Sequence, residues 1–128
     1  MMLTENLAFL EELREGVRAV CKRFDDEYWR NLDEIDGYPT EFVEAITQAG
    51  FLGALIPEQY GGSGLGILEA SVILEEINRS GGNAGACHAQ MYTMGTIFTA
   101  WFSGTKGKIF TEDCGRIASF TSIWGDRA

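Results

Sequence analysis

The sequence predicts an all-α domain, a bundle of about four helices, followed by a poorly ordered C-terminal tail. Apolar residues recur at three- and four-residue spacing in the segments before residue 98, which is the spacing of amphipathic helices. No segment before Phe98 alternates apolar and polar residues as a half-buried strand does. Glycines and prolines separate the periodic segments. These patterns predict a helical domain over residues 1–97 and a separate tail over residues 98–128.

The first helix is expected from about Thr4 to Arg30, because one apolar stripe runs along that segment. Its members are Leu3, Leu7, Leu10, Leu13, Val17, Val20, Phe24 and Tyr28. The polar and acidic residues 31–37 predict a loop. Pro39 suits the first turn of a second helix, where its missing N–H would be unpaired anyway. Gly50 suits the left-handed residue that ends this helix. One face of it is expected to carry Phe42, Ala45, Ile46 and Ala49.

Two more helices are expected after the short apolar run 51–56, which Pro57 closes. The third is expected over Ile67–Asn78, directly after a glycine-rich turn. Residues 79–82 break the pattern, and a fourth helix follows over about Asn83–Ile97. This last helix is rich in small residues, which allow a neighbouring backbone or a ligand to come close.

Charge and cysteine content exclude several classes of function. The formal net charge of -9 disfavours binding to nucleic acid, because an acidic surface repels the phosphate backbone. No apolar run approaches the length of a membrane span, and the acidic N-terminus does not suggest a signal peptide. The three scattered cysteines contain no CxxC pair, so neither a disulfide framework nor a zinc site is predicted, and a reducing cytoplasm is expected. The single histidine, His88, excludes His-rich metal sites.

The glycine-rich segment 61–66 does not match a nucleotide-binding motif. Ile67 stands where the dinucleotide fingerprint needs its third glycine, and no Gly-Lys-Ser/Thr follows. The residues themselves therefore indicate a turn with positive φ that leads into a helix. The neighbouring carboxylates Glu75 and Glu76 point about 100° apart on a helix, so a solvated face is predicted rather than an acid–base pair.

Four positions of the fourth helix share one face, because Gly85, His88, Ala89 and Tyr92 follow the spacing i, i+3, i+4, i+7. On residue type alone they indicate a core stripe in which a backbone group hydrogen-bonds His88. Another interpretation of the same four positions comes from a family resemblance.

The stretch Gly53–Gly66 reads Gly-Ala-Leu-Ile-Pro-Glu-Gln-Tyr-Gly-Gly-Ser-Gly-Leu-Gly and leads into a helix with paired glutamates. This sequence resembles the N-terminal helical domain of flavin-dependent acyl-CoA dehydrogenases, and the resemblance covers Thr4 to about Ile97. It implies that the glycine-rich loop belongs to the domain walling the substrate side of the cleft. It also implies that Gly85, His88, Ala89 and Tyr92 face the pocket for the acyl chain.

The resemblance implies the chemistry of the intact enzymes. They oxidise the Cα–Cβ bond of an acyl-CoA thioester: a carboxylate removes the α-proton and FAD takes the β-hydride. An electron-transfer flavoprotein reoxidises the flavin, and the enzymes are usually homotetramers. The family's catalytic carboxylate lies in a later domain, so no catalytic residue, no cofactor-binding residue and no metal ligand is expected in this chain.

The resemblance stops at the boundary Ile97–Phe98. Members of the family usually continue there with a sequence like Leu-Arg-His-Gly-Ser and later reach the sequence Gly-Val-Thr-Glu-Pro. A shift of the reading frame by one base lets Phe98–Phe102 read as Leu-Arg-His-Gly-Ser, and Ile123–Ala128 as Phe-Gly-Val-Thr-Glu-Pro. The sequence therefore predicts a frameshift, and with it a truncated acyl-CoA dehydrogenase that alone is inactive and binds no FAD. The alternative is a small helical binding or interaction module derived from this domain. In that case the apolar residues of the tail should pack, namely Trp101, Phe102, Phe110 and Trp124.

Overall fold

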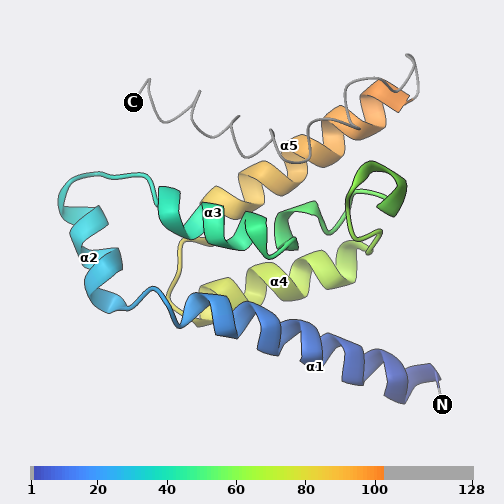
Figure 1. The fold of residues 1–128 in the computed structure, drawn as a ribbon, viewed down its shortest axis with the longest axis horizontal. Helices are drawn as coiled ribbons and strands as arrows, with labels where there is room; N and C mark the ends of the chain where they lie inside the picture. Colours follow the sequence, from blue (N-terminus) through green and yellow to red (C-terminus); the bar gives the residue numbers. More distant parts are fainter. Residues whose placement is uncertain (1, 103–128) are drawn as a thin grey trace.

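The computed structural model describes residues 2–102, which fold into α-helices and two short 3₁₀ helices without any strand (Figure 1). The helices are α1 (Met2–Cys21), α2 (Asp26–Glu34), α3 (Thr40–Gln48), η1 (Phe51–Gly53), η2 (Glu58–Tyr60), α4 (Ile67–Arg79) and α5 (Ala84–Phe102). The prediction of an all-α domain is confirmed. Residues 103–128, most of the predicted tail, lie outside the described range.

One core joins the longer helices. α1 and α4 run in the same direction, and α3 and α5 run in the opposite one (Figure 1). α4 contacts both α1 and α5, while η1 packs against α3 and α5. Each helix turns one apolar face inward, as amphipathic helices do. The buried cluster consists of Val17, Cys21, Phe24, Phe42, Val43, Ala45, Ile46, Leu52, Ala54, Ile56, Ala70, Ile73, Ile77, Ala84, Cys87, Met91 and Met94.

The predicted helix Thr4–Arg30 is wrong as a single element, because the chain breaks it between α1 and α2. Asp25 is the N-cap of α2, and its carboxylate accepts a hydrogen bond from the backbone N–H of Tyr28 at 2.9 Å. Such a cap starts a new helix by satisfying an N–H that has no partner within it. The apolar spacing continues across the break through Phe24 and Tyr28, whose rings meet edge to face. α2 then continues to Glu34, into the segment predicted as a loop.

α3 largely follows its prediction. Pro39 is the N-cap, immediately before the first helical residue Thr40. Phe42, Ala45 and Ile46 are buried as expected. Ala49 is exposed at the end of the helix, and Val43 is buried in its place. Gly50 has a φ of 86°, the left-handed conformation expected of the glycine that ends this helix.

α5 continues past its predicted end at Ile97 and reaches Phe102. No glycine or proline interrupts this part of the helix. Phe98 is half-buried against the core, and its ring meets that of Tyr60 at a centroid distance of 5.6 Å. The helix therefore crosses the boundary that separates the predicted domain from the predicted tail. Within residues 2–102, no helix has the length and apolarity that crossing a membrane requires.

Candidate functional site

The face of α5 that points away from the core carries all four predicted pocket residues. Gly85, His88 and Tyr92 are exposed, Tyr92 by 55%, and Ala89 is half-buried. The opposite face of the helix supplies the core residues Ala84, Cys87, Met91 and Met94. The interpretation of the four positions as a core stripe is therefore wrong. They form one outward surface, which we call the α5 face.

Two aromatic rings dominate the α5 face. The rings of His88 and Tyr92, one helical turn apart, meet edge to face at a centroid distance of 5.1 Å. The small residues Gly85 and Ala89 lie on the same face of the helix. The helix begins next to this surface because Asn83 Oδ1 accepts a hydrogen bond from the N–H of Gly85 at 3.0 Å.

A tyrosine from outside α5 reaches this helix. The Tyr38 hydroxyl, from the loop between α2 and α3, accepts a hydrogen bond from Gln90 Nε2 at 3.4 Å. Partial burial raises the pKa of Tyr38, so the phenol stays protonated at neutral pH. Sequence reasoning missed Tyr38, because nothing local marks a loop residue whose partner lies 52 positions away.

The glycine-rich loop is fastened to the segment before it. Leu65 N–H donates to the carbonyl of Ala54 at 2.7 Å, and Gly64 N–H donates to that of Ile56 at 2.8 Å. Gly61 and Gly64 have positive φ, which confirms the predicted turn. A Cβ on Gly62 would overlap the backbone carbonyl of Ile56, so the loop needs glycine there. The loop is a tightly folded connection into α4.

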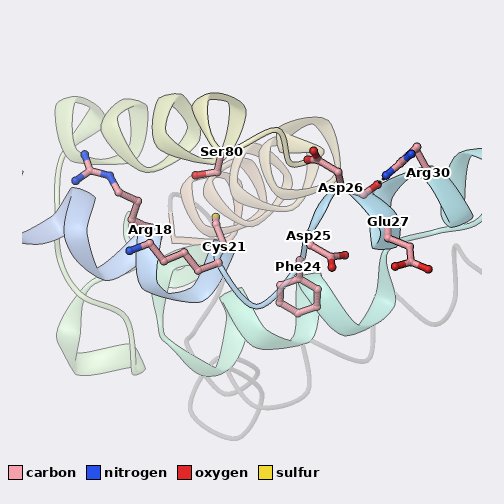
Figure 2. A pocket seen from close by; sticks show the side chains of 9 residues that line it. Arg18, Cys21, Phe24, Asp25, Asp26, Glu27, Arg30 and Ser80 are labelled. Carbon is pink, nitrogen blue, oxygen red and sulfur yellow. Dashed lines mark hydrogen bonds between the residues drawn. The ribbon is translucent and has the colours of Figure 1, made fainter.

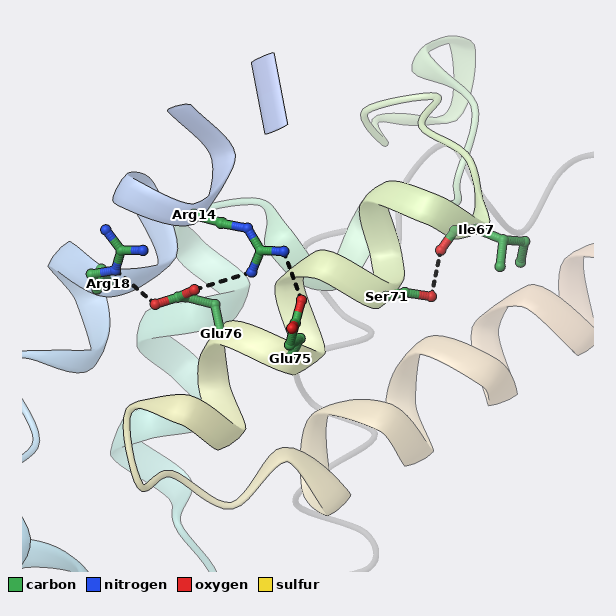
Figure 3. A network of polar contacts seen from close by, with 6 residues as sticks. All are labelled: Arg14, Arg18, Ile67, Ser71, Glu75 and Glu76. Atoms are coloured by element: carbon green, nitrogen blue, oxygen red, sulfur yellow. Dashed lines mark hydrogen bonds and ion pairs between the residues drawn. The ribbon is translucent and has the colours of Figure 1, made fainter. Parts of the chain in front are cut away.

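The two adjacent glutamates of α4 have different roles (Figure 3). Glu76 is 1% exposed, and it accepts hydrogen bonds from Arg18 Nε at 2.7 Å and Arg14 Nη1 at 3.3 Å. The predicted solvated face is wrong for Glu76. It is right for Glu75, whose side chain is 61% exposed and pairs with Arg14 at 2.7 Å. The hydrogen bond from Arg18 holds the pKa of Glu76 below its ordinary value despite burial. Both carboxylates therefore bind α4 to α1 and do not form an acid–base pair.

A surface pocket of about 600 Å³ lies where α1 ends, α2 begins and α4 ends (Figure 2). It is lined by Arg18, Cys21, Lys22, Phe24, Asp25, Asp26, Glu27, Arg30 and Ser80. Three basic side chains are matched there by three carboxylates, so the lining has no net positive charge for the diphosphate of FAD. Phe24 is the one aromatic ring in this lining, too little apolar surface for a flavin. The pocket does not fit FAD, and residues 2–102 contain no cluster suited to a metal ion.

Comparison with known proteins places these features in a known sequence family. A model of the acyl-CoA dehydrogenase N-terminal domain matches residues 9–105, a range that includes the glycine-rich loop and the α5 face and that extends past Ile97. The match also includes the glutamates of α4.

Several curated proteins are similar to the chain. A probable acyl-CoA dehydrogenase of Mycobacterium tuberculosis is 30% identical over 89 residues, which are 68% of this chain and 23% of that protein. Isovaleryl-CoA dehydrogenase of Pongo abelii is 38% identical over 80 residues, 59% of this chain and 19% of the enzyme. (2S)-methylsuccinyl-CoA dehydrogenase of Cereibacter sphaeroides is 38% identical over 77 residues, 55% of this chain and 14% of the enzyme. The chain thus spans less than a quarter of the length of these relatives. No solved structure matches it.

Proposed function

Because this chain belongs to the acyl-CoA dehydrogenase family, as its N-terminal domain, we propose that it forms one wall of the active-site cleft in an enzyme that oxidises acyl-CoA thioesters. The observation that carries the proposal is the α5 face. It lies inside the segment that matches the family and is turned away from the domain's own core. In the proposed enzyme Gly85, His88, Ala89 and Tyr92 contact the acyl chain.

The reaction itself needs parts that the described domain does not offer. FAD, when bound, accepts the β-hydride in the intact enzymes, and a carboxylate in a later domain removes the α-proton. The surface pocket at the end of α1 does not fit FAD, and the paired glutamates of α4 are engaged with Arg14 and Arg18. We therefore propose that this chain alone is inactive and binds no FAD tightly, and that its own contribution is to position the acyl group and exclude water from it.

The intact enzyme would share the assembly and partners of its family. We propose a homotetramer whose flavin is reoxidised by an electron-transfer flavoprotein. A reducing cytoplasm suits the chain, because Cys21 and Cys87 are both free thiols in the core.

We propose further that the reading frame changes at Ile97–Phe98. The support for this frameshift is that a one-base shift recovers the family's sequence motifs in the right order, from Leu-Arg-His-Gly-Ser to Gly-Val-Thr-Glu-Pro. Two observations weigh against a change at this codon: α5 runs on to Phe102, and the family match runs on to residue 105. DNA sequencing across codons 95–105 distinguishes a shifted frame from an ordinary continuation.

A small helical interaction module is the second candidate function, and the contact of Phe98 with Tyr60 favours it. A tail shaped by selection should bury its apolar residues, and Phe98 is half-buried against the core. The side chains of Trp101, Phe102, Phe110 and Trp124, which would extend this argument, lie outside the described part of the chain.

Restoring the frame tests the proposal. A one-base deletion at the Ile97–Phe98 boundary, which would reverse the proposed shift, should open a frame that continues into a β domain and a second helical domain. The product should bind FAD, and an acyl-CoA should reduce that flavin, since hydride transfer needs flavin, thioester and base in one cleft. The 128-residue chain is the matched control and should show neither property. A stop codon immediately downstream in the restored frame would refute the frameshift, and the interaction module would become the better proposal.

A further inference from the structure

The α5 face has a polar character that a site for a plain hydrocarbon chain does not need. His88 and Tyr92 are its two large side chains, and each ends in a group that can donate or accept a hydrogen bond. Their mutual ring contact involves the aromatic surfaces. Among residues 2–102, no group hydrogen-bonds the imidazole nitrogens of His88 or the hydroxyl of Tyr92. In the free domain, water can satisfy both groups because both side chains are exposed.

Covering this face with an acyl chain would remove that water. An imidazole and a phenol buried against an alkyl chain would each lose a hydrogen-bond partner, and an unpaired buried polar group weakens binding substantially. Sites built to hydrogen-bond a substrate reject analogues that lack the matching group far more strongly than apolar pockets discriminate by size. The chemistry of the α5 face therefore constrains the acyl group.

We infer that the acyl group of the substrate carries an oxygen substituent beyond Cβ, and that His88 and Tyr92 hydrogen-bond this oxygen. The inference rests on the proposed function. A hydroxyl, a carbonyl and a carboxylate share this chemistry. Charge on α5 does not oppose any of them, because residues 84–102 contain no aspartate or glutamate. His88 and Tyr92 are both exposed, so a substituent can reach their polar groups from outside the helix.

The test uses the full-length, frame-restored enzyme and acyl-CoAs of equal carbon number. One has a straight alkyl chain and one a branched alkyl chain; the others carry a hydroxyl, a keto group or a terminal carboxylate beyond Cβ. The dissociation constant is measured from the change in the flavin spectrum, and kcat and KM from flavin reduction. An oxygen-bearing substrate should be preferred by at least roughly tenfold in kcat/KM, mainly through KM.

Variants assign the preference to the two residues. Tyr92→Phe keeps the ring and removes the hydroxyl, and His88→Leu removes both nitrogens, so each should reduce the preference severalfold. His88→Asn restores a hydrogen-bonding group and should recover part of it. Ser71→Ala, which removes an exposed hydroxyl from α4, should leave the preference unchanged.

The outcomes separate the two proposals. If alkyl substrates are preferred, or if Tyr92→Phe and His88→Leu leave the preference unchanged, the inference about oxygen is overturned while the dehydrogenase function stands. If no acyl-CoA reduces the flavin, the proposed function fails and the inference fails with it.

Discussion

Replacing Glu76 with glutamine should destabilise the domain by about 2 kcal/mol. Glu76 is 1% exposed and accepts hydrogen bonds from Arg18 at 2.7 Å and from Arg14 at 3.3 Å. The amide keeps the shape of the side chain, but it removes the negative charge. One oxygen still accepts a bond, while the other position becomes an NH₂ group that faces an arginine, donor against donor.

The size of this loss in stability depends on the hydrogen bonds that Glu76 no longer accepts and on how far water can replace them. A hydrogen bond to a charged group contributes roughly 1.5–3 kcal/mol, and breaking a buried ion pair costs about 3–5 kcal/mol. The side chains of Arg14 and Arg18 are 21% and 36% exposed, so water can partly satisfy them. The lower part of the range therefore applies. For a domain of this size, the loss lowers Tm by roughly 10 °C.

The adjacent residue provides the control. Glu75→Gln removes the same charge from the same helix, but the Glu75 side chain is 61% exposed. Exposed ion pairs contribute little, so a loss below about 0.5 kcal/mol is expected. Both variants can be measured in the 128-residue chain by urea unfolding and thermal unfolding, followed by far-UV circular dichroism. Equal losses in the two variants would refute the reasoning from burial.

The pH dependence gives an independent check of the same interaction. The folded pKa of Glu76 lies below its ordinary value of 4.5, chiefly because Arg18 donates a hydrogen bond to the carboxylate. The stabilisation is therefore complete above the unfolded pKa and is lost as the pH falls through the lowered folded pKa. Between about pH 5 and about pH 3, the free energy of unfolding should fall more steeply in the wild type than in Glu76→Gln. If the free energy of unfolding has the same pH dependence in both proteins, the ion pair of Glu76 does not cause it.

Three further predictions concern the loop, the core thiol and the proposed pocket. Gly62→Ala should lower the free energy of unfolding by about 1–3 kcal/mol because its Cβ would overlap the carbonyl of Ile56. Gly53→Ala, whose Cβ would meet the Gly62 Cα at an ordinary contact distance of 3.7 Å, should cost much less in the same unfolding assay. Burial raises the pKa of Cys87 to about 12, so in a variant that lacks the other two thiols (Cys21→Ala, Cys114→Ser) Cys87 should react with Ellman's reagent at neutral pH only as fast as the chain unfolds. Rapid reaction of that folded variant would disprove this. In the frame-restored enzyme, Ala89→Leu should lower kcat/KM for long or branched acyl-CoAs more than for short ones, because each methylene that no longer fits costs roughly 1–3 kcal/mol of transition-state binding. A uniform loss across chain lengths would count against Ala89 as a pocket residue.

The periodic spacing of apolar residues predicted most of the helices, because burial of one face determines where an amphipathic helix forms. It could not locate the break between α1 and α2, since Phe24 and Tyr28 continue the stripe while packing against each other across the break. A different local signal was present there. Asp25 precedes the acidic residues Asp26 and Glu27, which is the pattern of a capped helix start.

The buried state of Glu76 could not be predicted from its neighbourhood in the sequence. Its partners Arg14 and Arg18 lie 62 and 58 positions earlier, and only the packing of α1 on α4 brings them together. The orientation of α5, in contrast, could have been predicted from the sequence. The set Cys87, Met91 and Met94 is more apolar than the competing set that includes His88 and Tyr92, so hydrophobicity alone favours burying the first set.

The ion pairs and the α5 face are connected through α4. α1 and α5 lie on different sides of this helix (Figure 3), and α4 contacts both of them. Glu75 and Glu76 fasten α4 to α1, whereas α5 packs against the domain through the side that bears Cys87 and Met91. The position of the α5 face therefore depends on packing behind it, and that packing depends in turn on where α4 is held. The buried charge of Glu76 on α4 thus helps to hold in place the surface that is proposed to meet the substrate.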